Sequence, residues 1–280
     1  MRRRHWTVVI VLVLVFLGVG LVLPAISKVR AAAARSVCHS NFKGLVTSLH
    51  NYASADGNGS FPPGTLPNAN LPPERRLSWV VPVVPYLDSN DLYRQFDLKA
   101  PADDGRNRTA TSFRWKYFVC PASGDYEYDG RDGSWKSPTP LTHYVGVAGV
   151  SADAATLPLR HPKAGPFGYD RRTKLNEEGF PDGTSNTLLV IETAQHPGHW
   201  AFGGSATVRG IEPGAAPYIG TGRPFGGFHD CGWDWFRPRT HLCVAAMADG
   251  SVRSFTHATA PEVLEALATV GGKETLPADW

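Results

Sequence analysis

Charged residues are scarce in this chain of 280 residues, and no acidic residue occurs before Asp56. Only 19% of the residues are charged, whereas 42% are hydrophobic. The six basic residues from Arg2 to Arg35 account for the formal net charge of +3, because the other 22 Lys and Arg face 25 Asp and Glu. The rest of the chain is therefore slightly acidic. Since nucleic acid is held chiefly by basic patches on phosphate, we expect no nucleic-acid partner.

Several catalytic and metal-binding motifs are also missing. The sequence contains no G-x-S-x-G, no H-E-x-x-H and no C-x-x-C, which are typical of serine hydrolases, zinc proteases and zinc or redox sites. A catalytic triad would have to combine Ser185, His241 and Asp249. We do not expect one, because a serine in such a turn is expected to hydrogen-bond its own backbone. We therefore predict no enzyme activity, no cofactor and no metal site, and an envelope hydrolase is the least favoured alternative.

The longest uncharged run lies near the N terminus. Residues 7–26 read TVVIVLVLVFLGVGLVLPAI, and 20 residues at about 1.5 Å each suffice to cross a hydrocarbon core of about 30 Å. We predict a single-pass membrane anchor. The alternative is a signal peptide cleaved at an Ala-x-Ala site within residues 31–34. The length of the apolar run and the charges of Lys28 and Arg30 argue against cleavage.

The chain has four cysteines, which are Cys38, Cys120, Cys231 and Cys243. An even number behind a membrane-targeting segment fits disulfides outside the cytosol, and four cysteines allow three pairings. Our preferred pairing joins Cys38 to Cys120 and Cys231 to Cys243, and free buried thiols are the alternative. Because basic residues flank the apolar run on both sides, the cysteines decide the orientation. We expect a cytoplasmic N terminus and an extracytoplasmic body.

An amphipathic helix is predicted beyond the apolar run. Apolar residues recur at helical spacing at Phe42, Leu45, Val46, Leu49, Tyr52 and Ala53. Joined through RAAAAR, both stretches predict one helix from about Trp6 to about Ala53, roughly 70 Å long and kinked at Pro24. The expected units are a cytoplasmic tip and membrane anchor over 1–27, an amphipathic continuation over 28–54, and a β-rich extracytoplasmic domain over 55–280.

Strands and loops are predicted after this helix. Aromatic and β-branched residues predict strands over 113–120 and 143–147, whereas the prolines in residues 77–86 argue against a regular central strand. Residues 242–255 predict a hairpin, and their Asp249-Gly250 pair predicts a type I′ turn. The fold class is therefore α+β, with a long helix packed on an antiparallel sheet that carries long loops.

Five segments in order resemble a large bacterial family of unknown function, domain of unknown function 1559. They are CHSNFKGLVTSLHNYASADGNGSFPPG, LSWVVPVVPYLDSNDLYRQFDLKAP, FVCPAS, FGYDRRTKLNEEGFPDGTSNTLLVIETA and HLCVAAMADGSVRSF. Members begin like type IV prepilins, carry a central DGTSNT signature and end near an Asp-Gly hairpin preceded by histidine. The resemblance implies a type IV pilin-like fold. It also implies a hydrogen-bonded signature turn that feeds a strand, made by Asp182, Gly183, Thr184, Ser185, Asn186 and Thr187.

The sequence departs from the prepilin pattern at two N-terminal positions. His5 stands where the cleavage-site glycine is expected, and Ile10 stands where a glutamate engages the amine of a neighbouring subunit. A larger side chain obstructs cleavage, and an apolar one cannot pair with an ammonium group. We therefore expect an anchored monomer or small oligomer. The C-terminal motif falls on His241, Asp249 and Gly250, although the family's histidine would fall at Arg239.

These features favour a structural or interaction-based function in the envelope or in a secretion or pilus-like system. The expected partners are the membrane and envelope or pilin-like proteins. The alternative is a membrane-tethered module that binds a glycan or protein through Trp233, Trp235 and Phe236, because aromatic faces flanked by polar groups suit such contacts. The same aromatic residues also fit a small local core pinned by a disulfide.

Overall fold

The computed structural model describes residues 2–123, 128–129, 134–135, 139–220, 222–226, 228–231 and 240–277. The α-helices in these ranges are α1 (Arg2–Ala55), α2 (Asn90–Tyr93), α3 (Arg108–Thr111) and α4 (Pro261–Ala268). The strands are β1 (Tyr128–Asp129), β2 (Ser134–Trp135), β3 (Leu141–Thr142), β4 (Tyr144–Val150), β5 (Leu188–Glu192), β6 (Gly198–His199), β7 (Val208–Ile211), β8 (His229–Cys231), β9 (Thr240–Met247) and β10 (Val252–Thr256). The 3-10 helices are η1 (Pro73–Arg75), η2 (Val81–Leu87), η3 (Gly105–Asn107), η4 (Lys116–Phe118), η5 (Ala154–Thr156), η6 (Thr184–Asn186), η7 (Gly204–Ala206) and η8 (Pro213–Ala215).

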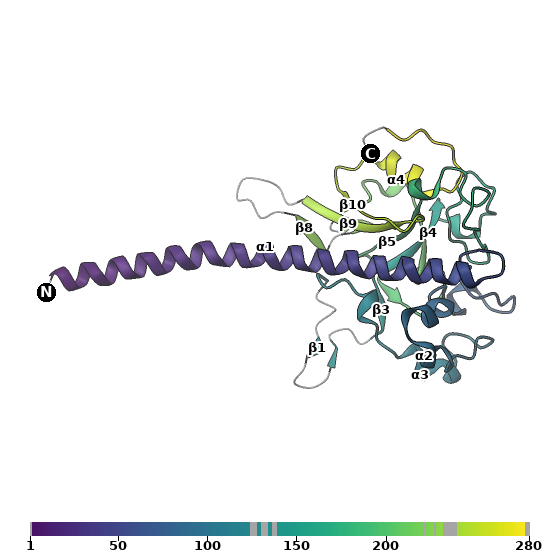
Figure 1. Cartoon of the computed structure of the whole chain (residues 1–280), viewed down its shortest axis with the longest axis horizontal. Coiled ribbons are helices and arrows are strands. Elements are labelled where there is room, and N and C mark those ends of the chain that lie inside the picture. Colours follow the sequence, from purple (N-terminus) through teal and green to yellow (C-terminus); the bar gives the residue numbers. More distant parts are fainter. Residues whose placement is uncertain are drawn as a thin grey trace.

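Helix α1 is continuous and leaves the body as a long arm (Figure 1). Its 54 residues extend about 81 Å at 1.5 Å per residue. Apolar side chains such as Leu14 and Phe16 are exposed on the arm, whereas the stripe from Cys38 to Ala53 is buried in the body. The predicted single helix and its buried stripe are confirmed. The helix continues through Pro24 without a break and bows gently over its length, so the proline does not divide it as a sharp kink would.

Among the described residues, α1 is the helix that is long and apolar enough to cross a membrane. The apolar window lies within residues 11–55, and none of it is buried against the rest of the protein. The residues that make the arm apolar are therefore not used to build the core of the body.

The body is built on a six-stranded sheet in which the strand order is β10-β9-β5-β4-β7, and β8 also pairs with β9. The pairs between these strands are antiparallel, except that β4 and β7 run parallel. The predicted α+β class is confirmed, but the sheet is mixed rather than wholly antiparallel. The long connection between β4 and β7 permits this, because parallel neighbours need a crossover rather than a tight turn.

Helix α1 covers one face of the sheet and α4 covers the other. Successive side chains of a strand point to opposite faces, and β9 shows this alternation. The residues that pack in the core on the α1 side are Leu242, Val244 and Ala246, and those on the α4 side are Cys243, Ala245 and Met247. The register of the sheet therefore decides which side chains meet α1.

Two local elements differ from the sequence prediction. Residues 113–120 form no strand and instead contain the 3-10 turn η4 over Lys116–Phe118. Trp115 and Phe118 both pack on Trp200, with ring centroids 6.1 Å apart in each pair, and residues three apart in a strand would face opposite sides.

The predicted hairpin of β9 and β10 is confirmed, but its turn is not type I′. Gly250 alone of the pair has positive φ, at 86°, as in a type I turn followed by a left-handed glycine.

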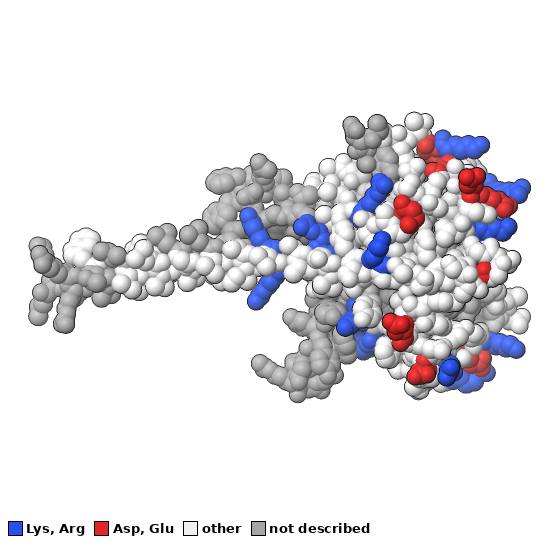
Figure 2. All heavy atoms as spheres, viewed as in Figure 1, with Lys and Arg blue, Asp and Glu red and all other residues white. Residues whose placement is uncertain are grey.

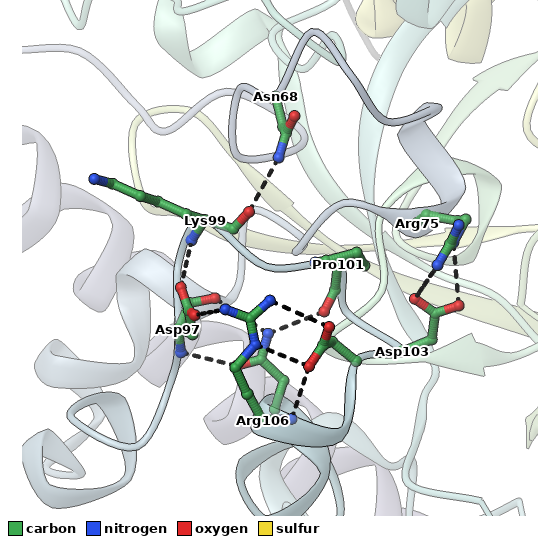
Figure 3. A network of polar contacts seen from close by, with 9 residues as sticks. Asn68, Arg75, Asp97, Lys99, Pro101, Asp103 and Arg106 are labelled. Carbon is green, nitrogen blue, oxygen red and sulfur yellow. Dashed lines mark hydrogen bonds and ion pairs between the residues drawn. The ribbon is translucent and has the colours of Figure 1, made fainter.

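A polar network holds the loops around α3 (Figure 3). Arg106 pairs with Asp97 at 2.5 Å and with Asp104 at 3.0 Å, and these pairs face solvent. Beneath them, the buried side-chain amide of Asn107 accepts a hydrogen bond from the backbone N–H of Asp97 at 2.8 Å. It also donates to the carbonyl oxygens of Asp97 and Pro101, at 3.1 and 3.0 Å. The buried amide contributes more than the ion pairs, because solvent screens exposed charges.

We expect Asn107→Ala to lower the free energy of unfolding by about 2 kcal/mol, because it leaves buried backbone groups without partners. Arg106→Ala is the matched control and is expected to have little effect. Urea denaturation of the purified protein measures both variants. A larger loss for Arg106→Ala than for Asn107→Ala would contradict this account of the network.

Candidate functional site

Four side chains that can bind a metal meet between α1 and the sheet, and they are Cys38, Cys120, Glu192 and His229. We call them the buried cluster. Their ligand atoms all lie within 4.8 Å of one another. The Sγ atom of Cys120 lies 3.2 Å from the Sγ of Cys38 and 3.3 Å from Nε2 of His229. Oε1 of Glu192 lies 3.3 Å from the same Nε2 and 3.9 Å from the Cys38 Sγ. His229 is 3% exposed and the other three residues are 0% exposed.

The sheet register explains why these groups share one face. Glu192 ends β5 opposite Tyr144 of β4, whose ring packs in the core on the α1 side. On β8, His229 lies opposite Leu242, which also packs on the α1 side. Side chains of directly paired residues point to the same face of a sheet. The carboxylate and the imidazole therefore both reach the helix, where Cys38 lies in the buried half of α1.

Neighbouring groups fix the members of the buried cluster in place. The backbone N–H of Val244 donates to Oε2 of Glu192 at 3.3 Å, which leaves Oε1 directed at His229. The hydroxyl of Tyr144 donates to the Cys38 sulfur at 3.4 Å. The backbone N–H of Cys120 donates to Nδ1 of His143 at 3.0 Å.

The surroundings of the buried cluster shift the pKa values of its two thiols in opposite directions. The hydrogen bond from Cys120 outweighs burial and lowers the pKa of the Cys38 thiol to about 6. Burial, reinforced by Cys38 and Glu192, raises the pKa of Cys120. Burial by itself lowers the pKa of His229, but its hydrogen bonds to Cys38 and Glu192 prevail and raise it to about 10. The arrangement thus favours a thiolate at Cys38 beside a protonated His229, which is the charge pattern of a reactive cysteine.

Among the cysteines whose side chains the structure describes, Cys38, Cys120 and Cys243 are free thiols, so the expected disulfides are not shown. Cys38 and Cys120 are neighbours, as expected, but their sulfur atoms lie 3.2 Å apart, whereas a disulfide bond is about 2.05 Å long. Cys231 pairs with Thr240 in the β8–β9 ladder, and its register does not bring it opposite Cys243. The side chain of Cys231 lies outside the described residues.

Sequence spacing gave no indication of the buried cluster, because each donor comes from a different part of the chain. The cysteine pair is separated by 82 residues, and Cys120 is separated from His229 by 109. Glu192 and His229 were not among the predicted site residues. One signal was available, since Glu192 places a carboxylate at the end of the otherwise apolar run LLVIE, and buried acids are rare unless paired or bound to a metal.

The DGTSNT segment forms the predicted hydrogen-bonded turn that leads into β5. Gly183 has a φ of 91°, a conformation that glycine tolerates far better than other residues. The side-chain amide of Asn186 donates to the carbonyl of Asp182 at 3.1 Å, and the hydroxyl of Thr187 donates to that of Gly183 at 3.0 Å. Ser185 is exposed. The signature therefore shapes the backbone ahead of the strand that ends in Glu192.

This turn meets the C-terminal hairpin. The backbone N–H of Asp249 donates to the carbonyl of Thr184 at 3.0 Å. Helix α1 contacts the same hairpin turn, because Nζ of Lys43 donates to the carbonyl of Gly250 at 3.0 Å and Nε2 of His50 lies 2.9 Å from the carbonyl of Ala248. The two recognisable motifs and the helix thus support one another.

The other predicted site residues are dispersed or undescribed. His241 lies near the start of β9, and Asp249 follows its end. A strand rises about 3.3 Å per residue, so His241 and Met247, near the two ends of β9, are about 20 Å apart. Since Asp249 neighbours the signature turn, the geometry does not assemble a triad of Ser185, His241 and Asp249. The aromatic residues Trp233, Trp235 and Phe236 lie outside the described residues, and binding through them stays a prediction.

We expect Thr187→Val to lower the free energy of unfolding by about 1–2 kcal/mol, because a buried hydroxyl bond is lost at nearly constant volume. Ser185→Ala changes an exposed hydroxyl in the same turn and is expected to have no measurable effect. Thermal and urea denaturation test both. Equal destabilisation by the two variants would show that the signature turn depends on different contacts.

Comparisons with known proteins agree with the motifs. A family model described as a protein of unknown function, DUF1559, matches residues 27–262. The matched region starts at the end of the apolar run and includes the buried half of α1, all four members of the buried cluster and the sheet. No curated protein and no solved structure matches the chain. The chain therefore belongs to the DUF1559 family of proteins of unknown function.

Proposed function

We propose that this protein is a non-enzymatic, single-pass membrane protein with an extracytoplasmic body, and that it serves as a structural or interaction component of the envelope or of a pilus-like or secretion system. The observation that carries the proposal is the contrast between the two halves of α1. The first half exposes large apolar side chains over its described length, whereas the second half buries the stripe from Cys38 to Ala53. Such an exposed apolar surface is favourable in a lipid environment and unfavourable in water.

The charges beside the arm support this proposal. Figure 2 shows an uncharged stretch of the arm, followed by basic side chains close to the body. Lys28 and Arg30 are exposed there and Arg35 is half-buried. Long basic side chains at the end of a membrane-spanning helix can extend into the headgroup layer. This placement would keep the body close to the membrane surface.

An interaction role is supported by a groove of about 840 Å³ that lies along one side of the buried half of α1. Its lining includes Asn51, Tyr86, Phe113 and Tyr117, and the last two side chains are largely exposed. Aromatic residues are enriched where proteins contact one another. We infer an envelope protein as the partner.

A non-enzymatic role is supported by the enclosure of the reactive groups. Cys38 and His229 have the charge pattern of an activated cysteine nucleophile, but both are buried between α1 and the sheet. A substrate would have to displace the helix to reach them. The buried cluster is better suited to holding the fold than to turnover.

We expect the full-length protein to stay in the membrane fraction through alkaline carbonate washing and to need detergent for release. The double variant Val13→Lys and Phe16→Lys should lose membrane retention, because each charge at the centre of the span costs about 3 kcal/mol or more. Val37→Lys is the matched control, since Val37 lies on α1 outside the apolar run and is exposed.

Intact mass and N-terminal sequencing of each fraction complete the test. A chain that starts at Met1 in the membrane fraction supports an uncleaved anchor. A start at Trp6 would show processing as a prepilin and favour a filament subunit. A soluble chain that starts near Ala34 would contradict the anchor and identify the apolar run as a signal peptide.

A further inference from the structure

We propose that Cys38, Cys120, Glu192 and His229 bind one zinc ion, and that this ion fastens α1 to the sheet. The inference concerns a metal site in the body and does not depend on whether the arm crosses a membrane. It goes beyond the proposed function because it adds a structural cofactor to the fold.

The spacing of the donor atoms fits a tetrahedral ion. Zinc binds cysteine sulfur at about 2.3 Å, and histidine nitrogen and carboxylate oxygen at about 2.0–2.2 Å, so ideal donor separations are about 3.3–3.8 Å. The observed separations that join Cys38, Cys120, His229 and Glu192 in a ring are 3.2, 3.3, 3.3 and 3.9 Å. The two remaining separations, from Cys38 to His229 and from Cys120 to Glu192, lie within 4.8 Å, so movements of about 1 Å or less bring all six into the tetrahedral range.

The kinds of donor select the metal. Calcium and magnesium prefer oxygen ligands, whereas two cysteine sulfurs with an imidazole favour zinc among the common ions. In the bound form two thiolates, one carboxylate and a neutral imidazole would meet a divalent cation, so the ion would displace the protons that the cluster otherwise holds on sulfur and on Nε2 of His229. Four protein ligands fill the coordination shell, and all four residues are buried. These features match a structural zinc site rather than a catalytic one, which keeps an open position.

The surroundings resemble the outer layer of a metal site. Ligands of a metal are usually oriented by further hydrogen bonds, and here Val244 holds the Glu192 carboxylate while the Tyr144 hydroxyl bonds the Cys38 sulfur. The amide of Asn41 in turn donates to the Tyr144 hydroxyl at 3.4 Å. The donors are thus held in position by both α1 and the sheet.

The ion would join segments that are distant in the chain. Cys38 lies where α1 enters the body, since the preceding Val37 is 46% exposed and Cys38 is fully buried. The other donors belong to the segment after η4, to β5 and to β8. A single ion would therefore fix the first buried turn of α1 against the sheet and set the direction in which the arm leaves the body.

The first test measures the metal content of full-length protein purified in detergent without chelators. Elemental analysis is expected to find about one zinc per chain, and peptide mass spectrometry without reduction is expected to find Cys38 and Cys120 unbridged. Zinc content should fall at least about tenfold in Cys38→Ser and in His229→Gln, because each loses one of four ligands. Cys243→Ala is the matched control and should retain zinc, since this buried thiol belongs to the core on the α4 side.

Several results would overturn the proposal. They are a Cys38–Cys120 disulfide without zinc, a folded wild-type protein with no bound metal, a different metal at full occupancy, or zinc that persists in both ligand variants. Metal content of the wild type decides the question even if a variant fails to fold. Recovery of a soluble, zinc-loaded protein would contradict the membrane proposal and leave this one intact.

A second test addresses the fastening of α1. Hydrogen–deuterium exchange is compared before and after zinc is removed with a chelator. Backbone amides near Cys38 and in β8 should exchange faster after removal, whereas those of α4 on the opposite face should change little. Unchanged exchange near Cys38 would contradict the role of the ion in holding the helix.

Discussion

The body of this protein depends on the contact between the buried half of α1 and the sheet face that carries Tyr144 and Glu192. The ring of Phe42 lies 4.5 Å from that of Tyr144, and the helix covers a carboxylate that would otherwise face water. Because burying a charge is costly unless it is paired, the same contact must also supply partners for Glu192. The stripe of α1 from Cys38 to Ala53 is thus part of the core of the body, and the arm is a continuation of the same helix.

The DGTSNT turn and the Asp-Gly hairpin support this contact from the opposite end of β5. The signature turn sets the start of β5, and the hairpin turn that it touches offers carbonyl groups to Lys43 and His50 of α1. The buried cluster lies at the other end of β5. The helix is therefore held at two places, by backbone carbonyls near one end of the strand and by side chains near the other.

Much of this fold could be predicted from periodicity and turn chemistry. The apolar spacing from Phe42 to Ala53 predicted the buried face of α1, and Asp249-Gly250 predicted the hairpin, because both signals are local. The η4 segment was mistaken for a strand, since its aromatic content says nothing of which partner the rings find. The buried cluster could not be predicted from spacing, because its four donors come together only through the β4–β5 and β8–β9 registers and the docking of α1. No two cysteines lie close together in the sequence, but the fold brings the sulfur atoms of Cys38 and Cys120 within 3.2 Å of each other.

The continuity of α1 also links the rotation of the body to the length of the helix. Each residue of an α-helix turns the chain by about 100° and advances it by about 1.5 Å. The RAAAAR stretch lies between the exposed arm and the first buried turn. The length of this stretch therefore sets the rotation of the body about the axis of α1. One residue more or fewer there would change the height of the body by only about 1.5 Å, but it would rotate the groove beside α1 by about 100°, toward a different neighbour.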